Sequence, residues 1–250
     1  MAAEAAQKRH ERALERERQY ERTAWTAATP IQAHPYLAEK VVPSHGLRQG
    51  SEGQTITVQD REGNDREVSI AGRLLVPVAD ANGRMTSLQF IDPTAAKMFM
   101  PNSRVEGGHF VIGDMERPGP VLIAESYSTP ATLHELTGMP AVVAFNAGNL
   151  VPVAQTWRQL HPDRPIYITG DNDHRREAEG KPNVGREKAE EAAAAIGRLR
   201  AAARLCGAGR RNGLERLGAE PGPGDGASAG HGRHRGRRAR TNRPGLRRSP

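Results

Sequence analysis

Three short apolar runs, separated by helix-like segments, dominate the middle of the sequence. VLIAE (121–125), AVVAF (141–145) and PIYITGD (165–171) read as buried strands. Continuous apolar strands that alternate with helices are typical of a parallel sheet covered by helices on both faces, with right-handed crossovers. This pattern predicts an α/β domain over residues 120–197.

The helices between these strands carry ordinary start and stop signals. Thr129-Pro130 supply an N-cap and a first-turn proline for a helix that ends near Gly138. Residues 150–160 place Val151, Ala154 and Trp157 on one face, and residues 186–197 form an Ala/Glu-rich segment. We therefore expect three helices around the three strands.

The segment before this domain follows a different pattern. Alternating apolar residues flank the turn REGNDR, and LLVPVA and MTSLQFI flank Asp80-Ala81-Asn82-Gly83, a strong hairpin signal. HFVIG (109–113) reads as one more strand. Residues 28–119 are thus expected to hold a small mixed or antiparallel β-sheet. Residues 1–27 precede it as a charged helix, either simply solvated or in contact with a nucleic-acid template.

The positive charge of the chain is concentrated at one end. The net charge is +7, but residues 201–250 contain 12 Arg, no Lys and 3 acidic residues, which leaves −2 on residues 1–200. Gly, Arg, Pro and Ala dominate from about residue 198, where periodicity ends. Such a composition cannot bury enough apolar surface to offset its ordering entropy, so the sequence predicts a disordered tail over 198–250.

Other features narrow the class of protein. The sequence has no run of 18 apolar residues, and its N-terminus lacks the apolar core of a secretory signal. Its one cysteine, Cys206, cannot form a disulfide framework or a cysteine-based zinc ribbon within the chain. We expect a cytoplasmic protein that makes no contact with a membrane.

Three carboxylates follow the predicted strands. Glu125 ends the first strand, Asp171 ends the third, and Asp173 lies two residues further on. Ligands of open parallel sheets bind beyond the carboxyl ends of the strands, and converging carboxylates suit a hard cation such as Mg2+. The alternative interpretation of each Asp is a helix cap or a turn residue. The combined pattern favours a metal-dependent acidic site.

Residues 121–197 resemble the Toprim catalytic domain of plasmid- and phage-type DNA primases. VLIAESYSTPATLHELTGMPAVVAFNAGNL resembles the first motif region of that family, and YITGDNDH followed by GKPNVGREKAEEAA resembles the second. HPYLAEKVVPSHGLR, LLVPVADANGRMTSLQFI and KMFMPNSRVEGGHFVIG resemble the leader that precedes the domain. The likeness extends over roughly residues 25–197.

The resemblance implies an activity and its cofactor. Glu125 would be a general acid/base or an additional metal contact, and Asp171 and Asp173 would bind Mg2+ or Mn2+. The reaction implied is nucleotidyl transfer, in which ribonucleoside triphosphates become RNA primers on single-stranded DNA. A replicative helicase or relaxase, on another chain or domain, is the implied partner. Two alternatives remain: a Toprim nuclease with the same acids, and a non-catalytic nucleic-acid-binding remnant.

Several residues near the motifs have two interpretations. Ser126 stands where the family usually has glycine, so it either crowds the site or adds a hydroxyl. Basic residues in the leader and after the acidic loop either contact phosphates or are ordinary surface charges, and those after the loop have acidic neighbours at helical spacing; they are Lys97, Arg104, Lys181, Arg186 and Lys188. His34, His45 and His109 lack metal-ligand spacing, and they are assigned no role.

The arginine-rich tail also predicts a change of reading frame. Residues 211–221 can be encoded so that the frame one nucleotide later reads GTDWNDLAQN. The resembled primases carry a D-W-N-D-L segment shortly after their Toprim helix. The tail is therefore expected to be a frameshift product, with the last strand of the sheet missing and catalysis weak or absent. Codons incompatible with GTDWNDL in the shifted frame would contradict this hypothesis.

Overall fold

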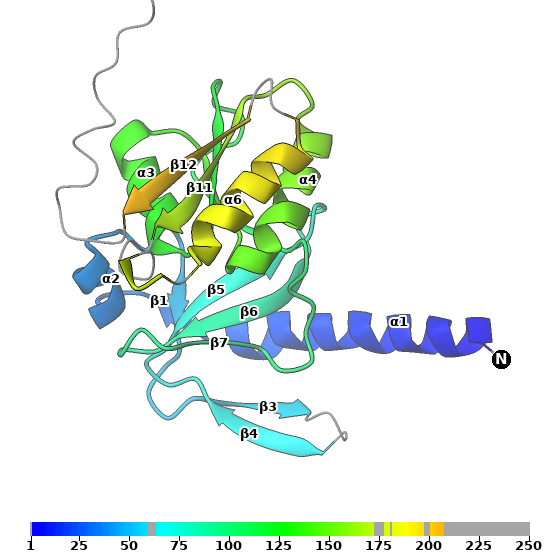
Figure 1. Cartoon of the computed structure of the whole chain (residues 1–250). Helices are drawn as coiled ribbons and strands as arrows, with labels where there is room; N and C mark the ends of the chain where they lie inside the picture. The colour runs from blue at the N-terminus through cyan, green and yellow to red at the C-terminus, as the bar shows by residue number, and fades with distance from the viewer. Residues whose placement is uncertain (1, 60–63, 173–177, 181, 198–200, 208–250) are drawn as a thin grey trace, which may run out of the picture. The chain divides into compact units, whose positions relative to one another are not determined.

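The computed structural model describes residues 2–59, 64–172, 178–180, 182–197 and 201–207 (Figure 1). Asp173, Lys181 and the tail from residue 208 onward, with the predicted frameshift, lie outside the described residues. Within the described part of the chain, no helix is long and apolar enough to cross a membrane.

The N-terminal segment is helical, as predicted. Helix α1 (Ala2–Tyr20) continues into a short π-helical turn, Glu21–Trp25. Arg48 holds the end of this segment, because its Nη1 donates to the Trp25 carbonyl at 2.9 Å and its guanidinium lies 4.9 Å from the centre of the Trp25 ring. The side chains described on α1 are mostly exposed, which agrees with either interpretation of this helix.

An antiparallel sheet follows, in the order β1-β2-β5-β6-β7. Its strands are β1 (Thr29–Pro30), β2 (Arg48–Gln49), β5 (Leu74–Ala79), β6 (Met85–Ile91) and β7 (Lys97–Phe99), and α2 (Pro35–Lys40) lies between β1 and β2. The predicted hairpin joins β5 to β6. Asp80 Oδ1 accepts from the amides of Asn82 and Arg84, and Gly83 takes a φ of +74° that suits glycine.

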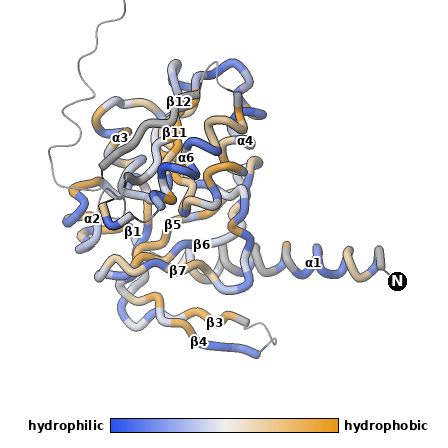
Figure 2. The backbone as a smooth tube through the Cα atoms, viewed as in Figure 1, coloured by the Kyte–Doolittle hydropathy of each residue, from blue (hydrophilic) through white to orange (hydrophobic). Residues whose placement is uncertain are grey.

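A second hairpin, β3 (Thr55–Gln59) and β4 (Asp65–Ser69), forms a separate two-stranded sheet. Ile56 and Val58 of β3 are buried against the antiparallel sheet, whereas β4 is largely exposed. Figure 2 shows this contrast between a mainly hydrophobic β3 and a mainly hydrophilic β4. The alternation in the sequence therefore predicts the buried face correctly.

The predicted α/β domain forms a second five-stranded sheet in the order β12-β11-β9-β10-β8. The three predicted strands are present and parallel: β9 (Val121–Ala124), β10 (Ala141–Val143) and β11 (Ile166–Asn172). β8 (Phe110–Ile112), expected among the upstream strands, instead pairs antiparallel with β10. The helices are α3 (Ser128–Thr137), α4 (Leu150–Leu160) and α6 (Val184–Ala195), and the 3-10 turn η2 (Ala147–Asn149) precedes α4.

The other edge strand corrects the prediction for the tail. Residues 201–207, expected to be disordered, form β12 (Ala201–Gly207), which pairs in parallel with the whole of β11. The sheet therefore does not lack the last strand that the frameshift hypothesis removed. Main-chain hydrogen bonds explain the error. A segment without proline can form the hydrogen bonds that an unpaired strand edge offers, whatever its side chains are, so its composition does not exclude a strand.

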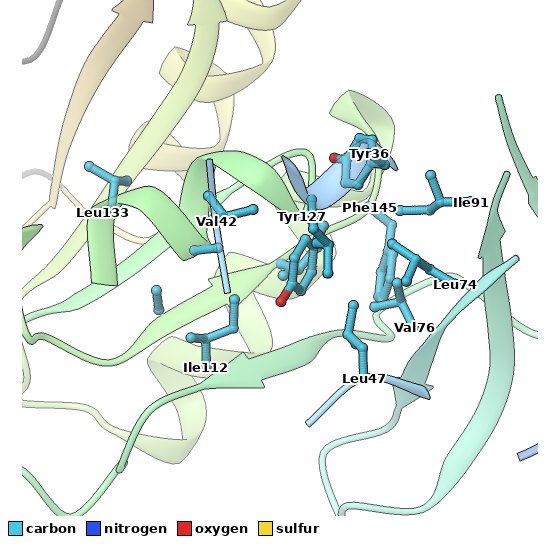
Figure 3. Packing of buried hydrophobic residues seen from close by; sticks show 14 of the residues in the cluster. Tyr36, Val42, Leu47, Leu74, Val76, Ile91, Ile112, Tyr127, Leu133 and Phe145 are labelled. Atoms are coloured by element: carbon cyan, nitrogen blue, oxygen red, sulfur yellow. The ribbon is translucent and has the colours of Figure 1, made fainter. Parts of the chain in front are cut away.

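The two faces of this sheet are covered differently. Buried residues of α4 and α6, among them Trp157 and Ala189, pack on one face with Ile123 and Ile168. The other face packs on α3 and on the antiparallel sheet, where Tyr127 and Phe145 lie next to Leu74 and Val76 of β5 (Figure 3). The leader and the α/β domain thus share one hydrophobic core.

A buried histidine caps helix α2 at the edge of this core. His34 caps α2: its Nδ1 accepts from the Tyr36 amide at 3.2 Å, and its Nε2 lies 3.0 Å from the Gly72 carbonyl, to which it donates. This arrangement needs a neutral ring. Burial lowers the pKa of His34, although the Gly72 carbonyl and the charge of Asp92 oppose that shift.

We therefore expect acid to destabilise the fold through His34. The unfolded chain takes up the proton near pH 6.5 and the folded chain only at lower pH, so the free energy of unfolding should decrease as the pH falls below about 6.5. Urea unfolding at pH 7.5 and 5.5 measures this loss. His34→Asn, which keeps a capping side chain, should show a smaller loss; an equal loss would contradict the prediction.

Candidate active site

Glu125 lies at the carboxyl end of β9. The strand ends at Ala124, and two residues after Glu125 the buried Tyr127 directly precedes α3. The Tyr127 hydroxyl donates to the Pro43 carbonyl at 2.9 Å, and burial raises the pKa of this phenol, which keeps it protonated. Glu125 is half-buried, in a turn held between the leader and α3.

Asp171 lies at the end of the neighbouring strand. β11 pairs in parallel with β9, with Thr169 opposite Ala124. Continuing this register places Gly170 beside Glu125 and Asp171 one residue further toward the carboxyl end. The structure thus brings two of the three predicted acids to adjacent strand ends, whereas Asp173 lies outside the described residues.

The chain reverses its direction of winding at these two strand ends. From β9 it continues into α3 on one face of the sheet, and from β11 it continues toward α6 on the other face (Figure 1). In open α/β sheets, such a switch point leaves a crevice between the two departing connections, and ligands bind there. Glu125 and Asp171 lie at the point where the topology predicts a ligand site.

Gly170 allows α6 to approach β11 closely beside the acidic residues. A Cβ atom on Gly170 would lie 2.4 Å from the Gly185 carbonyl oxygen and 2.8 Å from the Ala189 Cβ. The first turn of α6 therefore packs directly on the backbone of β11. The amino end of α6, capped by the Asn183 side chain that accepts from the Arg186 amide, is held near the end of that strand.

We expect Gly170→Ala to destabilise the domain, because α6 must move away from β11. Overpacking of this kind costs typically about 1–3 kcal/mol of unfolding free energy, which urea denaturation measures. Gly148→Ala is the matched control, since its new Cβ would lie 3.3 Å from Asn146 Oδ1 and touch no backbone. Equal stability of the two variants would show that α6 does not depend on this contact.

Ser126 adds a hydroxyl to the turn after Glu125. Its Oγ lies 3.4 Å from Ser128 Oγ and 3.5 Å from Thr129 Oγ1, at the start of α3. Three hydroxyls therefore lie together in the turn that follows Glu125. This arrangement favours the second interpretation of Ser126, a polar addition to the site.

The neighbouring strand end contains a polar residue that the sequence analysis did not single out. Asn149 is buried, and its side chain accepts from the Gly107 amide and donates to the carbonyls of Gly108 and Ala144. It ties the end of the leader to the carboxyl end of β10. The Asn-Ala-Gly-Asn sequence after an apolar strand was the available signal, because asparagine is rarely buried without specific partners.

A shallow pocket lies at this end of β10. Its volume is about 440 Å3, and its lining combines leader residues with the connection from β10 to α4: Val105, Glu106, Asn146, Gly148, Asn149, Val151, Pro152 and Gln155. Phe145, which precedes it, has a φ of +73° and packs against Phe99 with ring centres 5.9 Å apart. Neither Glu125 nor any β11 residue lines this pocket, so it is a feature beside the acidic site.

The predicted basic residues are divided between the two parts of the chain. Lys97 lies on β7 with its Nζ 5.9 Å from the centre of the Tyr36 ring, and Arg104 lies 3.5 Å from Asp80 Oδ2. On α6, Arg186 pairs with Glu190 at 3.0 Å and Lys188 with Glu191 at 2.6 Å. These are the helical ion pairs that the surface interpretation expects.

Comparison with known proteins defines the class of the domain. Residues 120–213 match the Toprim domain family, and this part of the chain belongs to it. The match extends beyond the predicted boundary at residue 197 and includes β12.

Two proteins to which the chain is similar are DNA primases. The chain is 36% identical to a DNA primase TraC of Escherichia coli in an alignment of 208 positions that covers 79% of this chain and 18% of that protein. A second Escherichia coli DNA primase TraC is 35% identical in an alignment of 207 positions that covers 79% of this chain and 13% of that protein. The chain thus spans less than a fifth of the length of these curated relatives, to which it is homologous.

A solved structure supports the fold. The RNA polymerase domain of Mycobacterium tuberculosis primase DnaG, in complex with double-stranded DNA, superposes with a TM-score of 0.52 at 17% identity, covering 83% of this chain and 77% of that one. At this identity the likeness concerns the arrangement of the elements. It includes the leader as well as the Toprim domain, since it covers far more than residues 120–213.

Proposed function

We propose that the chain is a primase-type nucleotidyltransferase that joins ribonucleotides into primers on single-stranded DNA. One observation carries the proposal: Glu125 and Asp171 lie at the adjacent carboxyl ends of β9 and β11, at the switch point of a Toprim sheet. The homology to DNA primase TraC over most of this chain supports the same reaction.

The donor atoms at this site fit a hard divalent cation. Glu125, Asp171 and Asp173 offer carboxylate oxygens, which Mg2+ and Mn2+ prefer, and Toprim domains are typically metal-dependent. We assign Asp171 and Asp173 as the metal ligands. When bound, the cation would neutralise charge on the phosphate oxygens.

Glu125 is the proposed general acid/base. Its half-buried position at the end of β9 holds the carboxylate close to the strand end that carries Asp171. There it can accept the proton of the attacking 3′-hydroxyl, or provide a further metal contact. The hydroxyls of Ser126, Ser128 and Thr129 lie together in the turn that follows Glu125 and can orient a polar ligand by hydrogen bonds.

The amino end of α6 is the proposed contact for the triphosphate. A helix amino end presents unpaired amides and a partial positive charge to anions. Arg186 and Lys188 lie on the first turns of α6, and their exposed ion pairs contribute little stability, so a phosphate can replace the acidic partners at small cost. Lys181, Lys97 and Arg104 remain proposed phosphate contacts for the nucleotide or the template.

A primer-synthesis assay tests the proposed function. The chain is incubated with single-stranded DNA, labelled ribonucleoside triphosphates and Mg2+, with or without a partner helicase or relaxase, and products are resolved by length. Metal-dependent oligoribonucleotides are expected. Shortened DNA without new RNA would instead indicate a Toprim nuclease, and binding without either product would indicate a non-catalytic remnant.

A further inference from the structure

Two histidines and a glutamate, one of them far from the others in the sequence, meet beside α3. His45 comes from the loop between α2 and β2, whereas His134 and Glu135 lie on α3. One ligand atom from each residue lies within 4.8 Å of the other two. The His45 Nε2 is already 3.4 Å from Glu135 Oε1, and the two imidazole rings meet edge to face with centres 5.3 Å apart.

The hydrogen bond of His134 fixes a ring tautomer that is compatible with metal binding. Its Nδ1 lies 2.7 Å from the Met139 carbonyl oxygen, and a carbonyl can only accept, so Nδ1 carries the proton. In the neutral ring, Nε2 then keeps a lone pair. Metal-binding histidines commonly donate their second ring nitrogen to a carbonyl in this way. Gly113 leaves room for the ring, because a Cβ there would lie 2.4 Å from His134 Cε1.

His45 has a buried nitrogen without a hydrogen bond. Its Nε2 is enclosed and has no hydrogen-bond partner among the described residues, and its backbone takes a φ of +42°, which is uncommon for a residue with a side chain. An ion pair between a charged His45 and Glu135 is a poor explanation for this enclosed nitrogen without a hydrogen bond. Burial lowers the pKa of His45, and the neighbouring His134 lowers it further against the opposing effect of Glu135.

We propose that His45, His134 and Glu135 form a binding site for a Zn2+-class transition-metal cation, separate from the acidic site at β9 and β11. Two imidazoles and one carboxylate form a set of ligands that suits zinc, whereas Mg2+ prefers oxygen alone. Tetrahedral zinc places its ligand atoms about 3.3 Å apart. The ligand atoms of the three residues, which lie within 4.8 Å of one another, must therefore move closer together when the cation binds.

The required movement is available at Glu135. Its side chain is 48% exposed and can change rotamer, and the exposed side leaves the fourth coordination position to water. The cation would join the loop that contains His45 to α3, the helix that follows Glu125. It would thus fix the leader against the Toprim domain, next to the contact between Tyr127 and Pro43.

Metal titration of the full chain tests this site without any measurement of catalysis. Mg2+ is kept in excess to occupy the acidic site, Co2+ is followed by its visible absorption, and Zn2+ affinity is measured by competition with a chromophoric chelator. One tightly bound ion per chain and a zinc-dependent rise in Tm are expected. His45→Ala and Glu135→Gln should each weaken zinc binding by more than about tenfold.

Two controls locate the bound ion. His10→Ala removes an exposed histidine of α1, and the double variant His231→Ala/His234→Ala removes those of the tail; both should bind zinc as the unchanged chain does. Unchanged affinity in His45→Ala and Glu135→Gln would overturn the proposal, as would loss of the ion in the tail variant. Glu135→Gln keeps the test decisive if His45→Ala fails to fold, because Glu135 is largely solvent-exposed.

Discussion

Replacing Glu125 by Gln, Asp171 by Asn and Asp173 by Asn is expected to abolish metal-dependent nucleotidyl transfer without unfolding the domain. The substitutions keep the shape of each side chain and remove its charge. Loss of Glu125, the proposed general acid/base, should by itself lower the rate at least about 100-fold. Loss of Asp171 or Asp173 should abolish the Mg2+-dependent activity, because neutral amides bind hard cations weakly.

Stability provides a second measurement of the same site. Mg2+ should raise the Tm of the unchanged chain, since it binds the folded state, and should leave the Tm of the triple variant unchanged. Without metal the triple variant should be at least as stable as the unchanged chain, because crowded carboxylates repel one another. Glu52→Gln, in an exposed turn, is the control that matches the single substitution Glu125→Gln in charge. Primer synthesis by the triple variant at the normal rate would refute the assignment.

Local sequence patterns predicted most of the secondary structure. Apolar runs such as VLIA and AVV are long enough to form strands and too short for helices, and both became central strands. The Asn82-Gly83 turn specified its hairpin because few residues other than glycine accept the required φ. These features depend on neighbouring residues alone, which is why the sequence was sufficient.

Strand pairing was predictable only in part. HFVIG was identified as a strand, but nothing in it indicates whether it joins the antiparallel sheet or, as β8, pairs with β10. β12 was missed for a related reason, because the open edge of β11 supplies its hydrogen bonds and its own composition does not predict them. Which strand edges stay open for pairing is decided by the assembled sheet, and not by the sequence of a single strand.

The candidate site shows the same limit. Glu125 and Asp171 could be found because strand ends of a parallel sheet meet at one edge, a rule that applies before any coordinates are known. His45 and Glu135 could not, since they lie 3.4 Å apart through a contact between a leader loop and α3. Spacing along the chain gives no sign of such a pair, and His45 was accordingly assigned no role.

The arginines of the tail are expected to dominate salt-sensitive binding of single-stranded DNA. Residues 1–200 carry a net charge of −2, so the folded part has little general attraction for phosphate, whereas residues 201–250 carry 12 Arg. Each phosphate neutralised on a single strand contributes about 0.7 to the slope of log affinity against log salt concentration. The charge distribution thus separates the proposed metal-dependent site, which is local to the folded part, from DNA binding by the many arginines of the tail.

Replacing the eight arginines between residues 233 and 248 by glutamine should weaken binding strongly at low salt. The slope should become shallower by up to about 6, because eight fewer phosphates can be neutralised. Fluorescence anisotropy with a labelled oligonucleotide at several salt concentrations measures both quantities. Arg9→Gln/Arg12→Gln on the exposed face of α1 is the control, and it should change the slope by no more than about 1.4. If the tail variant kept the affinity and slope of the unchanged chain, the folded part would have to supply the contacts, and Lys97, Arg104, Arg186 and Lys188 would be the first residues to replace.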